Sequence, residues 1–235
     1  MNYYTMFYEN GLTIVLAIIG FIIVLWAQIK VKGNYNKYKQ IQSSKSLTGA
    51  EVARMILDKN GLNNVHIVST SGELSDHYDP SRKVVRLSKD IFDDTSVASI
   101  AVAAHECGHA IQDKDNYTFM RIRGVLVPFV NLVSYLGYFV MIFSIFIGMT
   151  GYFMVGIIMI LATIIFQLVT LPVEFDASKR AGIQLKELGL INDLDQQGVK
   201  EMLKAAAMTY VASLISSIIS LLRLVIMLNN NNNDD

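Results

Sequence analysis

Four long apolar segments separated by polar ones set the first expectation for the architecture of this chain. The apolar segments occupy residues 12–29, 125–146, 152–171 and 206–228. A helix of about 20 apolar residues crosses the hydrocarbon core of a bilayer, so the pattern predicts a mainly α integral membrane protein with four transmembrane helices. No Lys or Arg precedes the first segment, and we expect it to be a retained span rather than a signal peptide.

The polar segment 30–124 carries patterns typical of a small α+β region. Thr48 and Glu51 have the spacing of a capping box, which predicts the start of a helix that ends near Gly61. The residues of this helix that are expected to face inward are Val52, Met55 and Ile56.

The pattern then changes from helical to alternating. Runs of β-branched residues predict strands at 65–70 and 83–88, with a loop at 71–82 between them. A further helix, capped by one of residues 94–96, is expected to run to about Gln112. The edge strand of such a pair is able to bind an extended peptide through backbone hydrogen bonds.

The composition supports a membrane protein and excludes some classes of partner. The chain has 235 residues, of which 52% are hydrophobic and 17% charged. Soluble domains carry about 25% charged residues, so the deficit favours the lipid bilayer as a partner. The net charge is zero, which provides no basic field for nucleic acid. The one cysteine, Cys107, excludes an internal disulfide.

Lysine and arginine are distributed unevenly among the segments that join the spans. They occur in residues 30–124 and 172–205 and are absent from the N-terminal residues, from 148–151 and from the C-terminal tail. The positive-inside rule therefore places both large polar segments in the cytoplasm. The expected organisation is an N-terminal transmembrane helix (1–29), a cytosolic region (30–124), a transmembrane hairpin (125–171), a second cytosolic segment (172–205), a fourth transmembrane helix (206–228) and a disordered tail (229–235).

Residues 105–109 read His-Glu-Cys-Gly-His, which is the H-E-x-x-H spacing of zinc hydrolases. On a helix, His105 and His109 lie one turn apart on the same face, where two imidazoles bind one Zn²⁺ ion. Glu106 lies beside them, in position to take a proton from water activated by the metal. Cys107 is interpreted as a buried apolar residue that points away from the metal, rather than as an oxidation-sensing thiol.

A catalytic zinc site needs a third protein ligand, and the segment 172–205 is the expected source. Glu174 is best placed, because it follows Pro172 where the third span leaves the membrane. We expect Glu187, Asp193 and Asp195 to be solvated. The acids of this segment are Glu174, Asp176, Glu187, Asp193, Asp195 and Glu201.

Three further residues are candidates for roles beside the metal. His77 and Tyr78 are candidate catalytic residues that stabilise the oxyanion, or else they belong to a loop in which Asp-Pro makes a turn. Gln112 lies three residues after His109 on the same helix face. It either supports the metal site or is a solvated residue of the last turn.

Three segments of the chain resemble one known family. Residues 105–112, the later segment 171–178 and the loop 76–80 look like the bacterial YugP-like neutral zinc metallopeptidases, whose members are expected to be membrane proteases. The resemblance covers nearly the whole chain. More distantly, the residues from Glu174 resemble the Glu-x-x-Ala-Asp signature of HtpX-type and CAAX-prenyl membrane proteases. This resemblance implies that Glu174 is the third zinc ligand, although Ser178 stands where the signature has Asp.

These observations predict a membrane-embedded zinc metalloendopeptidase with a zincin-like α+β region built around its H-E-x-x-H helix. His105, His109 and Glu174 bind Zn²⁺, and Glu106 is the general base. The site is expected on the cytoplasmic side, with proteins or peptides as substrates, membrane proteins among them. Two alternatives stay open: a zinc-binding membrane scaffold or sensor without proteolysis, and a four-span structural or transport protein in which the motif is accidental.

Overall fold

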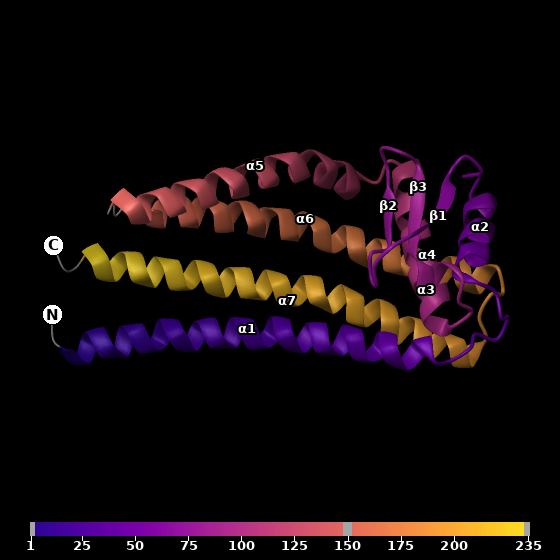
Figure 1. The fold of residues 1–235 in the computed structure, drawn as a ribbon, viewed down its shortest axis with the longest axis horizontal. Helices are drawn as coiled ribbons and strands as arrows, with labels where there is room; N and C mark the ends of the chain where they lie inside the picture. The colour runs from indigo at the N-terminus through magenta and orange to yellow at the C-terminus, as the bar shows by residue number, and fades with distance from the viewer. Residues whose placement is uncertain (1–2, 148–151, 233–235) are drawn as a thin grey trace. The chain divides into compact units, whose positions relative to one another are not determined.

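The computed structural model describes residues 3–147 and 152–232, and it is mainly helical (Figure 1). Within these described residues, three short strands form a single small sheet. In chain order the elements are α1 (Tyr3–Lys39), α2 (Gly49–Lys59), β1 (His66–Thr70), β2 (His77–Asp79), β3 (Val84–Ser88), α3 (Lys89–Phe92), α4 (Val97–Lys114), α5 (Thr118–Ile147), α6 (Tyr152–Glu187) and α7 (Asp193–Asn232).

Four of these helices have the length and apolar composition needed to cross a membrane. They are α1, α5, α6 and α7, and each contains one of the four apolar segments expected from the sequence. All four are longer than those segments, because their polar ends continue the same helix. In α6 the helix passes through Pro172, which lacks an N–H group and therefore removes only one intrahelical hydrogen bond.

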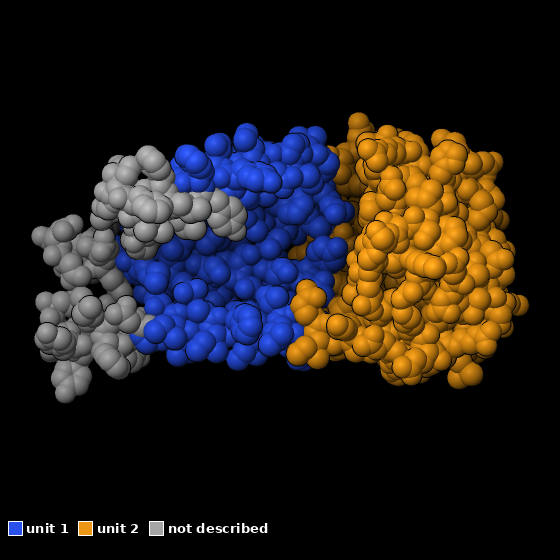
Figure 2. Space-filling view, in the orientation of Figure 1, with its two compact units in different colours: residues 1–27, 122–170, 209–235 blue, residues 28–121, 171–208 orange. Residues whose placement is uncertain are grey.

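The chain divides into two compact units (Figure 2). Unit 1 comprises residues 1–27, 122–170 and 209–235, and unit 2 comprises residues 28–121 and 171–208. Each of the four long helices contributes residues to both units.

Unit 1 exposes large apolar side chains over much of its described length. Phe21, Val125 and Tyr135 are 67%, 74% and 79% exposed, which is the pattern of helices in contact with lipid rather than water. Helices α1 and α7 approach closely where a Cβ added to Gly20 would lie 3.2 Å from Ser216 Oγ. Small residues such as Gly20 and Ser216 allow two apolar helices to pack this closely.

Two sequence predictions concern the ends of unit 1. Residues 148–151, which join the two helices of the expected hairpin, lie outside the described residues. Helix α7 continues to Asn232, into the segment 229–235 for which we expected a disordered tail, and residues 233–235 lie outside the described part.

The sheet of unit 2 has the strand order β1-β3-β2. Strand β3 pairs in parallel with β1, as at Val68 and Arg86, and antiparallel with β2, as at Tyr78 and Val85. The two predicted strands are present, but the prediction of a continuous loop over 71–82 is wrong at residues 77–79. Three residues are too few to show an alternating pattern, and β2 forms because its backbone pairs with β3.

Helix α2 forms as the capping box predicts. Thr48 accepts a hydrogen bond from the Glu51 N–H, and the Glu51 carboxylate accepts one from the Thr48 N–H. Val52 and Ile56 are buried as expected, but Met55 is 41% exposed, so that part of the prediction is wrong. The buried positions of α2 follow an i, i+3, i+4 stripe that contains Ala53 and passes beside Met55.

The core of unit 2 gathers around α4. Its residues Ala101, Ala103 and Ala104 are fully buried, together with Ile100. Small side chains on several faces allow α2, the sheet and α3 to pack closely on one helix. The helix that carries the H-E-x-x-H motif is therefore the central element of this unit.

Candidate metal centre

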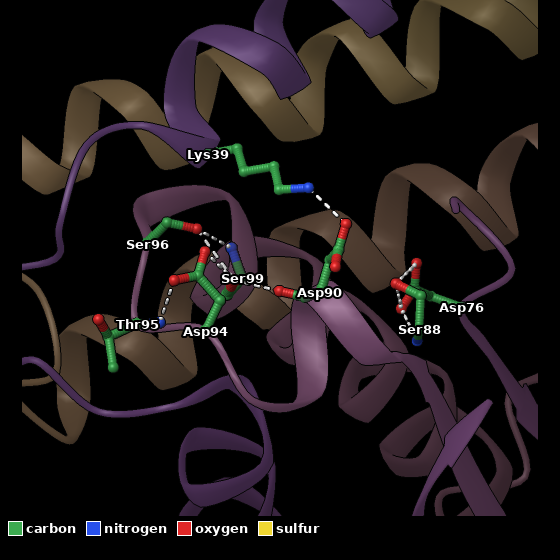
Figure 3. Close-up of polar contacts among 8 residues, drawn as sticks. All are labelled: Lys39, Asp76, Ser88, Asp90, Asp94, Thr95, Ser96 and Ser99. Atoms are coloured by element: carbon green, nitrogen blue, oxygen red, sulfur yellow. Dashed lines mark hydrogen bonds and ion pairs between the residues drawn. The ribbon is translucent and has the colours of Figure 1, made fainter. Parts of the chain in front are cut away.

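Polar side chains fix the start of α4, eight or more residues before the histidines (Figure 3). Ser96 is the N-cap and accepts a hydrogen bond from the Ser99 N–H. The Ser99 hydroxyl in turn contacts the carboxylate of Asp94 and the carbonyl of Asp90. Asp90 also pairs with Lys39 at the end of α1. These contacts set where α4 begins and hence where its later turns present their side chains.

Helices α4 and α6 approach each other at Gly108. A Cβ added there would lie 2.5 Å from the carbonyl oxygen of Ala177, a distance that real Cβ atoms essentially never show. Only glycine permits this approach. The contact lies one residue before His109 and three residues after Glu174, so it brings the faces that carry these side chains together.

His105, His109 and Glu174 form the one cluster of potential metal ligands in the described part of the chain. Glu174 Oε2 lies 3.3 Å from His105 Nε2 and 3.6 Å from His109 Nε2. Ligand atoms around a tetrahedral zinc at about 2.1 Å lie roughly 3.4 Å apart, so these separations fit one ion. Glu174 and His109 are 2% and 7% exposed, and His105 is somewhat more open. Two neutral imidazoles and one carboxylate are the donor set that zinc takes in hydrolases.

Glu106 is buried beside this cluster. Burial raises the pKa of its carboxyl to about 7, while the nearby His105 lowers it and the charges of Glu174 and Asp76 raise it. The backbone N–H of Tyr78 in β2 favours the charged form of the Glu106 carboxyl and lowers its pKa. The edge strand therefore lies beside the candidate general base.

The second nitrogen of each histidine also has a partner. His109 Nδ1 lies 3.0 Å from Oε1 of Gln112, which is fully buried, so Gln112 supports the site rather than standing in solvent. His105 Nδ1 lies 3.3 Å from Ser178 Oγ. The position at which the distant signature has Asp therefore still contacts a histidine, through a hydroxyl.

The two oxyanion candidates, His77 and Tyr78, differ in burial and in their hydrogen-bond partners. His77 is exposed, and its Nδ1 is 2.8 Å from the Ser75 carbonyl. Tyr78 is buried, and its hydroxyl donates to Asp113 Oδ2 at 2.7 Å. Burial raises the pKa of this hydroxyl above its usual range. A catalytic role for either side chain stays a prediction, and the contact of Tyr78 with the site runs through its backbone.

Cys107 is fully buried, and its thiol lies 3.6 Å from the Ala53 carbonyl in α2. Burial raises the pKa of the thiol, which disfavours the reactive thiolate. The side chain therefore belongs to the core of unit 2, in agreement with the apolar interpretation.

The remaining acids of the second polar segment do not reach the cluster. Glu187 and Asp193 are exposed as expected. The expectation that Asp195 is solvated is wrong, because it is 5% exposed and accepts a hydrogen bond from the Ser44 N–H. Its own N–H donates to the Asn192 side chain in a capping arrangement at the start of α7. The spacing Asn192-x-x-Asp195 was the signal in the sequence for this role.

Comparison of the sequence with known proteins finds a matching family and a similar relative. Residues 13–229 match the family described as "putative neutral zinc metallopeptidase". A relative from Bacillus subtilis (strain 168), named "putative membrane protease YugP", is 44% identical over 200 residues, which cover 85% of this chain and 89% of that relative. No solved structure matches the chain. These findings confirm the resemblance to the neutral zinc metallopeptidases that residues 76–80, 105–112 and 171–178 indicated.

Proposed function

Because the chain belongs to the neutral zinc metallopeptidase family, we propose that it is a membrane-embedded zinc metalloendopeptidase. The observation that carries this proposal is the meeting of His105, His109 and Glu174 at separations that fit one tetrahedral ion. The burial of Glu106 directly beside them adds the general base that a non-catalytic zinc site does not require.

Each residue has a defined part in this mechanism. His105 and His109 bind the metal through Nε2, and Glu174 binds it through a carboxylate oxygen. Zinc, when bound, supplies a Lewis acid that polarises the peptide carbonyl and lowers the pKa of water. Glu106 accepts the proton of the attacking water and then passes it to the leaving amine. The buried surroundings of Glu106 keep bulk water from taking part in this transfer.

The proposed location follows from the charge pattern and the apolar helices. Four candidate spans and a relative named as a membrane protease support an integral membrane protein. The lysines and arginines of residues 30–124 and 172–205 favour a cytoplasmic site. Membrane proteins with exposed cytosolic segments are then the proposed substrates. Reporter fusions at residue 60 test this orientation, and an external reporter there would overturn the cytoplasmic site.

The function is tested by measuring zinc content and cleavage of casein in three variants. Glu106→Gln is expected to keep zinc and lose cleavage, because the amide cannot accept the proton. Glu174→Ala is expected to lose most of its zinc, because only the two imidazoles remain as protein ligands and a catalytic site needs three. Glu187 is an exposed acid on α6, the helix that carries Glu174. Glu187→Gln is therefore the matched control, and it should retain both its zinc and its cleavage of casein.

Each result has a distinct meaning. Unchanged cleavage by Glu106→Gln would reject the mechanism, and full zinc occupancy in Glu174→Ala would move the third ligand elsewhere. Stoichiometric zinc in the wild type without cleavage of casein or any membrane protein would favour the scaffold or sensor.

A further inference from the structure

The amide of Gln112 has only one orientation that satisfies its neighbours. Its Nε2 lies 2.8 Å from the Val173 carbonyl and 2.9 Å from Asp176 Oδ2. Both of these oxygens only accept hydrogen bonds, and an amide nitrogen only donates them. Reversing the amide would place its oxygen against two other oxygens in a fully buried position, where unpaired polar groups cost the most.

This orientation decides which nitrogen of His109 carries the hydrogen. Gln112 Oε1 accepts only, so the His109 Nδ1 that faces it at 3.0 Å must be the donor. A neutral imidazole has one N–H group. Nε2, the atom that lies 3.6 Å from Glu174, is therefore left with its lone pair free for a metal.

Asp176 is itself held by a chain of ion pairs that joins α6 to the C-terminal end of α4. Its Oδ2 accepts from Arg180 Nε at 2.6 Å, and the same guanidinium donates to Asp115 at 2.6 Å. Asp115 is the C-cap of α4, whereas Asp176 and Arg180 belong to α6. The guanidinium also lies over the ring of Tyr117, at 5.9 Å from its centroid. Asp176 thus has little freedom to turn away from Gln112.

We propose that Asp176 and Arg180 are positioning residues that orient the Gln112 amide and so preset His109 in its metal-binding tautomer. They act without touching the metal or the substrate. His105 provides a contrast within the same site, since its Nδ1 partner is the Ser178 hydroxyl. A hydroxyl both donates and accepts, so it sets no tautomer.

The proposal deepens the proposed metal site and rests on it for its purpose, but its main test needs neither zinc nor substrate. Metal-free protein with ¹⁵N-labelled histidine is studied by long-range ¹H–¹⁵N correlation at a pH where the imidazoles are neutral. The neutral His109 ring is expected to be mainly the Nδ1–H tautomer, because Gln112 Oε1 faces Nδ1 at 3.0 Å whereas the competing Glu174 carboxylate lies 3.6 Å from Nε2. Gln112→Met is expected to populate both tautomers, and Asp176→Ala to populate the second tautomer detectably. Arg180→Lys, which keeps a cation at this position, should preserve more of the wild-type tautomer than Arg180→Met.

A matched control comes from another Arg–Asp pair in the same unit. Arg54 and Asp58 form an i, i+4 ion pair at 2.7 Å on α2, with no contact to His109. Asp58→Ala should leave the His109 signal and the zinc affinity unchanged. Zinc affinity should fall by about 10- to 100-fold in Gln112→Met, and by less in Asp176→Ala.

Two results would overturn the proposal: an Nε2–H tautomer of His109 in the wild type, or an unchanged Nδ1–H tautomer in Asp176→Ala. The second variant keeps Gln112 and decides the matter even where Gln112→Met does not fold. Absence of cleavage in a protein with the expected tautomers would count against the proposed function alone.

Discussion

Replacing Gly108 with alanine tests whether the close approach of α4 and α6 assembles the metal site. The added Cβ would lie 2.5 Å from the Ala177 carbonyl oxygen and 3.1 Å from its Cα and carbonyl carbon. All three atoms belong to backbone, so no side chain is able to turn aside. The first distance is about 0.9 Å short of the 3.4 Å at which ordinary van der Waals contact begins. The two helices must therefore separate by a comparable amount.

Such a displacement is large for a metal site. Zinc sites tolerate deviations of about 0.2 Å in ligand distances, and the Glu174 oxygen already lies 3.3 and 3.6 Å from the two imidazoles. We expect Gly108→Ala to lower zinc affinity by at least about 100-fold. Overpacking costs about 1–3 kcal/mol, but alanine regains about 1 kcal/mol of helix propensity, so the variant should still fold.

The assay is competition for zinc against a chromophoric chelator, with thermal unfolding measured beside it. Gly182→Ala on α6 is the matched control, because nothing lies within 4 Å of its added Cβ. This control should keep its zinc affinity and gain about 0.5–1 kcal/mol in stability. Wild-type zinc affinity in Gly108→Ala would refute the reasoning, since it would mean that the site does not depend on the helix contact.

Two further predictions concern stability. Thr48→Ala removes the capping box of α2 and should lower the free energy of unfolding by about 1 kcal/mol, visible as a lower unfolding temperature; an unchanged temperature would contradict the cap. Glu106 has a pKa of about 7 in the folded state against 4.5 for the ordinary group, so between these pH values the native state holds a proton that the unfolded state has lost. The metal-free protein should consequently lose on the order of 3 kcal/mol as pH rises through that window. Glu106→Gln should remove this loss, and identical pH profiles for the two proteins would argue against it.

The sequence predicts best those features that arise from local patterns. The four apolar segments, the capping box at Thr48 and the helix that carries His105 and His109 depend on residues close together in the chain. Glu174 was selected because it follows a rigid span, and the structure places it beside the histidines.

Features that depend on tertiary contacts were harder to predict. Strand β2 exists because β3 pairs with it, and three residues leave no periodic signal. The support of His109 depends on Gln112 meeting Asp176, which is 64 residues away in sequence. The contact of Ser178 with His105 likewise has no local signature, since a serine in a helix is ordinarily solvated.

The three candidate metal ligands are synthesised at different times, because two lie on α4 and the third lies on α6. The histidines of α4 are made before α5, whereas Glu174 is separated from His105 by 69 residues and follows almost the whole apolar part of α6. A nascent chain that has reached only α5 holds two imidazoles and the base Glu106, but no third ligand. In the proposed enzyme, hydrolytic competence therefore arises only after the hairpin has been completed. A chain whose synthesis stops within α5 is therefore expected to lack the complete set of candidate ligands.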